Sequence, residues 1–140
     1  QLLKIIKAKY LFLGEKDYQQ LYLIKKFIRN RFKIKVVSCK TIRSKNYLAL
    51  SSRNKLLNKN EIFIANKISK KLKLFYNSVK KDFKKKNNLK MIKKEILKYN
   101  IRLEYLEIRN KFNLSRNINR FNFKIFVAYY MREIRLIDNF

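Results

Sequence analysis

Two short polar stretches carry the side chains best suited to binding a phosphate group. The first is residues 11–20, L-F-L-G-E-K-D-Y-Q-Q, where Gly14, the only glycine of the chain, is closely followed by Lys16. Glycine lets the backbone approach a ligand and adopt a positive φ, and lysine is a mobile point charge that suits phosphate. The stretch therefore predicts an anion-binding turn.

The second stretch is residues 48–54, L-A-L-S-S-R-N, which places the hydroxyls of Ser51 and Ser52 beside the guanidinium of Arg53. Hydroxyls can hydrogen-bond a polyphosphate, and the arginine fork can neutralise it. The pattern is weak by itself, because Ser51 or Ser52 could instead be the N-cap of a helix. For chemistry to follow, both stretches must converge on one triphosphate.

The first turn needs a strand before it and a helix after it. Residues 9–13 form a short apolar run that predicts a buried strand. Residues 17–30 carry apolar side chains at helical spacing. The turn therefore lies at the carboxyl end of a strand, where open parallel sheets bind ligands, and the helix start adds free N–H groups that favour anions.

Asp17 and Gln20 also permit a purely structural interpretation of this turn. Their spacing is that of a capping box, with Asp17 at the N-cap and Gln20 at the third helical position. The two interpretations are compatible, because a capped helix can still present an anion site.

The composition indicates a folded protein with a large positive charge. The chain has 140 residues, 47% of them hydrophobic, and a formal net charge of +28. Such a charge usually indicates nucleic acid or an anionic membrane as partner. Here the basic residues are scattered and accompany abundant Asn, Ile, Phe and Tyr, no proline and one glycine. An A/T-rich codon bias accounts for all of these features, so we expect no nucleic-acid partner.

Several classes of site are excluded by residues that the chain lacks. It has one cysteine, Cys39, so an intrachain disulfide is impossible and a cytoplasmic location fits. It has no histidine, which excludes a histidine-based triad or histidine-ligated metal within these residues. No apolar run approaches the ~18 residues that a membrane helix needs. Because the chain begins with Gln1 in an apparent helix (residues 1–8), we expect a fragment.

The remaining elements predict an α/β protein. Residues 33–39 are apolar and β-branched, so strand, helix and strand form a parallel crossover at the tail of a Rossmann-like, doubly wound sheet. We place a boundary in the polar stretch 41–47, giving domains 1–43 and 44–140. The second domain is predicted to be a small α+β lobe. Its expected elements are a capping box at Asn58 and Glu61, helices 59–86 and 89–99, a polar loop 112–122, and strands 101–109, 123–130 and 135–139.

In this order, the motifs resemble the pantothenate synthetase, or pantoate–β-alanine ligase, family. The matching segments are G-E-K-D-Y-Q-Q at 14–20, T-I-R at 41–43, L-A-L-S-S-R-N at 48–54, Y-L-E-I-R at 105–109 and R-L-I-D-N at 135–139. Each is modest, but the ordered set spans nearly the whole chain.

The resemblance implies a two-step ligase whose substrates are ATP, pantoate and β-alanine, with Mg²⁺ accompanying ATP and a homodimer as the assembly. It also implies a role for each matching residue. Lys16 contacts phosphate, Gln20 hydrogen-bonds pantoate, and the backbone of Ile42 meets the adenine. The full implied set is Gly14, Glu15, Lys16, Asp17, Ile42, Leu50, Ser51, Ser52 and Arg53 for ATP, with Lys16, Ser51, Ser52 and Arg53 as the catalytic groups.

The chain departs from the family pattern in two places. The family's H-x-G-H segment is absent, which marks this as the carboxyl-terminal part and predicts that it is inactive alone. The acidic-glycine step that usually precedes L-A-L-S-S-R is replaced by Ser44-Lys45-Asn46-Tyr47. The shape of that loop is therefore expected to change.

Two other functions compete with the ligase. A related nucleotidyltransferase could share the sheet, and Gln20 is the only residue here that argues for pantoate. A basic RNA-binding module would instead gather its lysines and exposed aromatic rings on one face.

Overall fold

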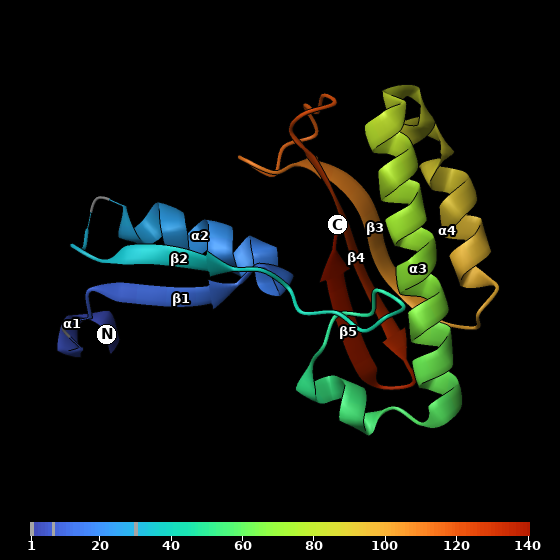
Figure 1. Cartoon of the computed structure of the whole chain (residues 1–140), viewed down its shortest axis with the longest axis horizontal. Coiled ribbons are helices and arrows are strands. Elements are labelled where there is room, and N and C mark those ends of the chain that lie inside the picture. The colour runs from blue at the N-terminus through green and yellow to red at the C-terminus, as the bar shows by residue number, and fades with distance from the viewer. Residues whose placement is uncertain (1, 7, 30) are drawn as a thin grey trace. The chain divides into compact units, whose positions relative to one another are not determined.

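The chain folds into two compact units, Gln1–Thr41 and Ile42–Phe140. The computed structural model, drawn in Figure 1, describes residues 2–6, 8–29 and 31–140. The division falls two residues before the expected boundary at residue 43, and Arg43 belongs to the second unit.

The first unit contains the predicted strand, helix and strand. Strands β1 and β2 pair in parallel, with Gly14 opposite Cys39 at their carboxyl ends. The expected helix in residues 1–8 is the single turn α1; residues 1 and 7, and residue 30 at the end of the second expected helix, lie outside the described residues. The elements are α1 (Leu2–Ile5), β1 (Tyr10–Gly14), the 3₁₀ helix η1 (Glu15–Asp17), α2 (Tyr18–Ile28) and β2 (Lys35–Cys39).

Strand β1 is only half buried, whereas the apolar run predicted a buried strand. Leu11 and Leu13 are partly covered, while Tyr10 and Phe12 are exposed with ring centroids 6.4 Å apart. Helix α2 supplies the buried side chains Leu21 and Ile28. Because side chains alternate between the two faces of a strand, one face of β1 is left open in the structure.

The second unit is the predicted α+β lobe. Its antiparallel sheet has the order β3-β4-β5, and α3 and α4 lie on one face of it (Figure 1). The elements are η2 (Ser52–Leu56), α3 (Lys59–Lys81), η3 (Phe83–Asn88), α4 (Leu89–Leu97), β3 (Arg102–Asn110), β4 (Phe123–Met131) and β5 (Ile134–Asn139).

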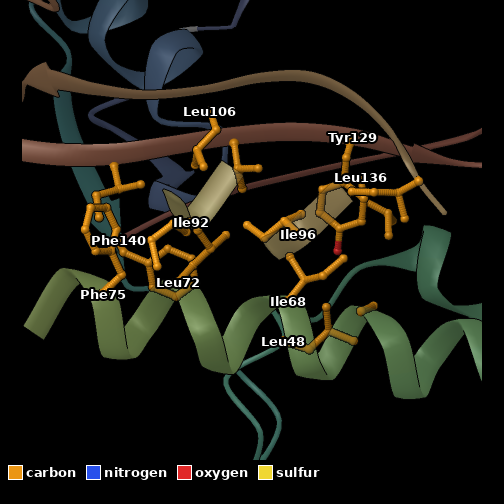
Figure 2. Close-up of a cluster of buried hydrophobic side chains, with 14 of the residues drawn as sticks. Leu48, Ile68, Leu72, Phe75, Ile92, Ile96, Leu106, Tyr129, Leu136 and Phe140 are labelled. Atoms are coloured by element: carbon orange, nitrogen blue, oxygen red, sulfur yellow. The ribbon is translucent and has the colours of Figure 1, made fainter. Parts of the chain in front are cut away.

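The core of this unit lies between α3 and the sheet (Figure 2). The apolar stripe predicted for the long helix is confirmed over most of its length. Its fully buried members alternate three and four residues apart, which places them on one helical face. They are Ala65, Ile68, Leu72, Phe75 and Val79, and they pack with Ile92 and Ile96 of α4 and with Ile125, Val127 and Tyr129 of β4.

Helix α3 ends at Lys81, five residues before the predicted end at residue 86. The backbone of Asp82 is extended, and its carboxylate accepts a hydrogen bond from the backbone N–H of Lys84 at 3.1 Å. A side chain that hydrogen-bonds the nearby backbone offers an alternative to the helical ladder. The chain therefore leaves the α-helix at Asp82 and continues as η3.

The start of α3 carries the predicted capping box. The Asn58 side chain accepts the Glu61 N–H at 2.9 Å, and the Glu61 carboxylate accepts the Asn58 N–H at 2.8 Å. The same carboxylate accepts from Arg132 in the β4–β5 turn. The Arg132 hydrogen bond, followed by that of Asn58, holds the pKa of Glu61 below its ordinary value. Because the folded-state pKa is lowered, this stabilisation is present at neutral pH and is lost as the pH falls through that value.

Four non-glycine residues adopt a positive φ among the described residues. They are Tyr47 (68°), Asn100 (53°), Leu114 (60°) and Arg132 (50°). Tyr47 stands immediately before L-A-L-S-S-R, where the family pattern usually carries a glycine. The turn has a left-handed backbone at this position, and a tyrosine occupies it.

Candidate functional site

The first group of predicted site residues lies on the turn that leaves β1. Gly14 ends the strand and Glu15, Lys16 and Asp17 form η1, so the group lies at the carboxyl edge of the parallel pair, as predicted. Gly14 itself is extended, with φ −70° and ψ 135°, so the expectation of a positive φ was wrong. A Cβ built on Gly14 would meet no atom of the structure within 4 Å. Neither the local backbone nor the packing of the described residues requires glycine here, and the turn has room for an incoming ligand.

The predicted capping box at the start of α2 was wrong. Asp17 occupies the N-cap position, but its side chain makes no capping hydrogen bond to the helix. Its φ of −94° and ψ of 56° differ from the extended conformation that N-cap residues favour, because the chain enters α2 from a 3₁₀ turn. The first N–H groups of the helix are therefore not capped by Asp17, and Gln20 is exposed on the first turn of α2.

Cys39 is a feature of this edge that the sequence analysis did not assign to it. It is the strand partner of Gly14, and its thiol is exposed. The signal was available in the sequence, because the last residues of two paired parallel strands must lie side by side. Cys39 therefore offers a chemical reporter of whatever binds near Gly14.

The second group begins with Ile42 and Leu50. An isolated antiparallel bridge between Arg43 and Ala49 brings the two together, and the Leu50 N–H donates to the Ile42 carbonyl at 2.9 Å. Their side chains are 73% and 53% exposed, whereas Leu48 and Ala49 between them are buried. The buried residues anchor the turn, and the exposed ones give it an apolar outer surface.

The serine–arginine segment continues directly from this bridge. Ser51 is the N-cap of η2, and its Oγ accepts the Arg53 N–H at 3.3 Å, so the capping role is confirmed for Ser51. Ser52 and Arg53 are exposed. The Asn54 side chain donates to the Ala49 carbonyl at 3.0 Å and closes the turn. The segment thus presents a hydroxyl and a guanidinium on a backbone that its own neighbours hold in shape.

An ion pair that the sequence analysis missed holds this turn to the sheet. Arg43 donates to both carboxylate oxygens of Asp138, at 2.7 and 2.8 Å, and Asp138 is 7% exposed. Arg43 also donates to the carbonyls of Tyr47 and Asn139, each at 2.8 Å, and its guanidinium lies 4.5 Å from the Phe140 ring centroid. The T-I-R and R-L-I-D-N motifs are therefore joined by a structural contact.

Tyr129 of β4 has a pKa above its ordinary value. Burial of its hydroxyl is the larger cause, and the negative charge of Asp138 is the second.

The site residues thus form two groups, one in each compact unit. The structure brings Gly14 to Gln20 together on one turn, and Ile42 together with residues 50–53 on another.

Among residues 2–6, 8–29 and 31–140, no three or more His, Cys, Asp or Glu side chains cluster in a way that could hold a metal ion. Within the same residues, every helix is too short or too polar to cross a bilayer.

Comparisons with known proteins agree on one family. A family model for pantoate-beta-alanine ligases matches residues 1–140. A pantothenate synthetase of Francisella tularensis subsp. novicida is 38% identical over 141 residues, and one of Francisella philomiragia is 39% identical over 145 residues. Each of these alignments covers 100% of this chain and 46% of the relative.

Solved structures match over nearly the whole chain. The crystal structure of pantoate-beta-alanine ligase from Francisella tularensis, complexed with beta-gamma ATP and beta-alanine, has a TM-score of 0.76 and 38% identity. A pantothenate synthetase structure from Thermus thermophilus has a TM-score of 0.83 and 28% identity. The matches cover 99% of this chain and 46% and 51% of those chains. The chain therefore spans about half the length of the relatives it matches.

Proposed function

The chain belongs to the pantoate–β-alanine ligase family, and we propose that the protein containing it condenses pantoate with β-alanine, using ATP, to form pantothenate. The observation that carries the proposal is the position of the family motifs on two exposed turns, one at the carboxyl edge of a parallel strand pair and one at the start of η2. Because this chain spans about half of its relatives, the activity is proposed for the longer protein.

The reaction would proceed in two steps. A carboxylate oxygen of pantoate attacks the α-phosphorus of ATP, the bond to the β-phosphate oxygen breaks, and pantoyl adenylate and pyrophosphate form. The β-alanine amine then attacks the acyl carbon, AMP leaves, and the amine loses a proton as the amide forms. Little covalent chemistry falls to the protein, so its contribution is positioning and stabilisation of the charge that builds up on pyrophosphate.

The exposed turns supply groups of the right kind for these tasks. We propose that Lys16 and Arg53 neutralise the phosphates, with the hydroxyls of Ser51 and Ser52 as hydrogen-bond donors. Ser51 can serve in this way while capping η2, because its Oγ accepts from the Arg53 N–H and its proton remains to be donated. Gln20, exposed on α2, would hydrogen-bond pantoate.

We propose that each turn contributes groups to nucleotide binding. Gly14 leaves room for close approach of the phosphates, with Glu15 and Asp17 beside it in η1. The exposed side chains of Ile42 and Leu50 provide an apolar surface for the adenine. We propose that Mg²⁺ enters with ATP on the phosphate oxygens, and its charge would be part of the same electrostatic balance. The family resemblance supports a homodimer and a cytoplasmic location as further proposals.

The test is an assay of the full-length protein for pyrophosphate release and pantothenate formation. Pyrophosphate release is expected to require pantoate, and AMP release is expected to require β-alanine as well. A nucleotidyltransferase would instead release pyrophosphate with a different acceptor and form no pantothenate. Pantoate-independent release, with no amide product, would reject the ligase in favour of that alternative.

The Gly14→Ala variant separates a role in ligand binding from a role in folding. The extended backbone and open surroundings of Gly14 accept a methyl group, so the free energy of unfolding is expected to change by no more than about 1 kcal/mol. A methyl that intrudes on a bound phosphate is expected to weaken ATP binding about tenfold, by analogy with overpacking.

Protection of Cys39 from alkylation gives the binding measurement for this variant. The thiol lies opposite Gly14, so ATP at this edge is expected to slow modification of Cys39, read by mass spectrometry of its peptide. Equal ATP protection in the wild type and in Gly14→Ala would contradict a nucleotide contact at Gly14. Rapid alkylation without ATP in both proteins is the control for thiol access.

A further inference from the structure

The second unit carries a basic groove that the proposed ligase chemistry does not use. Two adjoining hollows of about 670 and 450 Å³ share Lys81 and Arg120. They lie where the end of α3, η3 and the 111–122 loop meet. We call them together the basic groove, and its cationic side chains are Lys80, Lys81, Lys84, Lys85, Lys86 and Arg120.

The charge of this groove is almost uncompensated. Asp82 is the only acidic residue that lines it, and its carboxylate already accepts the Lys84 N–H. Within the described part of the chain, none of the six cations forms an ion pair. Clefts lined by one sign of charge focus the field and raise the local concentration of opposite charges. The groove is therefore suited to a ligand with several negative charges.

Codon bias explains the number of lysines but not this arrangement. Elsewhere in the same unit, acidic residues meet the cations: Lys71 pairs with Glu95, and Arg135 pairs with Glu104. Another hollow, between α3 and α4, contains that Lys71–Glu95 pair and so differs in character from the basic groove. No acidic residue occurs anywhere from residue 111 to residue 132.

Two exposed aromatic rings lie on the loop that supplies Arg120. Phe121 is 80% exposed and Phe112 is 68% exposed. The loop closes on itself, because the Lys111 N–H donates to the Asn122 carbonyl at 2.6 Å and the Phe121 N–H donates to the Asn119 side chain at 2.9 Å. The rings are thus presented on the same hydrogen-bonded loop that supplies Arg120 to the groove.

We propose that the basic groove binds single-stranded RNA, independently of the ligase reaction. A cationic groove that follows a phosphate backbone, beside aromatic rings on which bases stack, is the combination by which proteins bind single strands without sequence preference. Phosphates lie along Lys81, Lys85 and Arg120, and a base stacks on Phe121. An acidic polypeptide would match the charge but has no flat groups for the exposed rings, so the observations favour RNA.

The test compares two variants that lose the same charge. The groove variant is Lys81→Gln, Lys85→Gln and Arg120→Gln. The control is Lys90→Gln, Lys93→Gln and Lys94→Gln, three exposed positions on α4 that line neither the basic groove nor the hollow between α3 and α4. Binding of a fluorescein-labelled 12-nucleotide oligouridylate to the 140-residue chain is followed by anisotropy at several salt concentrations.

The groove variant is expected to bind the oligonucleotide at least about tenfold more weakly. The slope of log K against log salt concentration is expected to be shallower by about 2, because three fewer phosphates are neutralised and roughly 0.7 of a counterion is released per phosphate of a single strand. The control is expected to lose less than about twofold, because none of its three side chains lines the groove. Phe121→Ala, which removes one stacking ring, is expected to weaken binding by about tenfold.

Three results would overturn the proposal. Equal losses in the two charge variants would mean that only bulk charge attracts the oligonucleotide. Full affinity in Phe121→Ala would remove the stacking contact that distinguishes RNA from other polyanions. Competition by polyglutamate as effective as that by unlabelled oligouridylate of the same charge would indicate an acidic polypeptide as the partner. All substituted side chains are exposed, so circular dichroism is expected to be unchanged.

Discussion

Arg53→Ala and Lys16→Ala in the full-length protein are each expected to slow pyrophosphate release by about a hundredfold, the cost of losing one charged contact to a transition state. Arg53 is exposed at the start of η2, so its truncation leaves the fold of the second unit intact. The effect should fall on the rate of the chemical step, because charge develops on pyrophosphate only as the bond to it breaks.

Matched variants separate this role from general charge. Lys55→Ala is exposed in the same η2 segment as Arg53, and Lys26→Ala is exposed on the same helix that follows Lys16. Both are expected to keep nearly wild-type rates. A rate equal to that of the wild type in Arg53→Ala or Lys16→Ala would refute the assignment of that residue.

The double variant tests whether the two turns serve the same phosphates. If Lys16 and Arg53 act on one leaving group, their effects are coupled, and the double variant should lose less than the product of the single losses. A strictly multiplicative loss would mean that the two residues act at independent places.

Asp138→Asn is expected to destabilise the second unit by about 3 kcal/mol, the lower end of the range for breaking a buried ion pair by removing one partner. The side chains of Arg43 and Asp138 are 21% and 7% exposed, so the guanidinium would lose its charge partner where water can only partly replace it. Because asparagine preserves the shape of the side chain, the loss of stability measures the contribution of the Asp138 charge. Urea unfolding followed by circular dichroism measures it.

Arg132→Ala serves as the comparison, because Arg132 forms a bidentate pair with Glu61 and its own side chain is 62% exposed. Exposed pairs contribute little to stability, so a much smaller loss is expected there. Equal losses in Asp138→Asn and Arg132→Ala would show that the Arg43–Asp138 pair contributes no more to the free energy of unfolding than the Arg132–Glu61 pair.

Arg43 also donates to the Tyr47 carbonyl, so Asp138→Asn should additionally raise the KM for ATP by loosening the turn that carries Leu50.

Patterns that depend on period and side-chain type were predicted well from the sequence. The apolar spacing of α3 follows from burial of one helical face, and the parallel pairing of β1 with β2 follows from the order strand, helix, strand. The Asn58 capping box was also predicted, because both of its residues favour that geometry and lie next to a regular helix.

The predictions for Asp17 and Gly14 were wrong for one local reason. Residue types did not reveal the 3₁₀ turn between β1 and α2, which leaves Gly14 extended and turns Asp17 out of the capping conformation. The Arg43–Asp138 contact was missed for a different reason. Its partners are 95 residues apart in sequence, and no periodic pattern relates such distant positions. The motifs located both turns, but the contact that anchors the second turn to the sheet joins residues far apart in the sequence.

The scarcity of glycine has a thermal consequence. Tyr47, Leu114 and Arg132 hold left-handed backbones that disfavour a Cβ by roughly 1 kcal/mol each. Folded domains are stable by only about 5–15 kcal/mol, so three such positions consume a sizeable part of that margin. A protein built this way should melt several degrees below a relative that has glycine at these turns, and in the cell it would depend more heavily on chaperones.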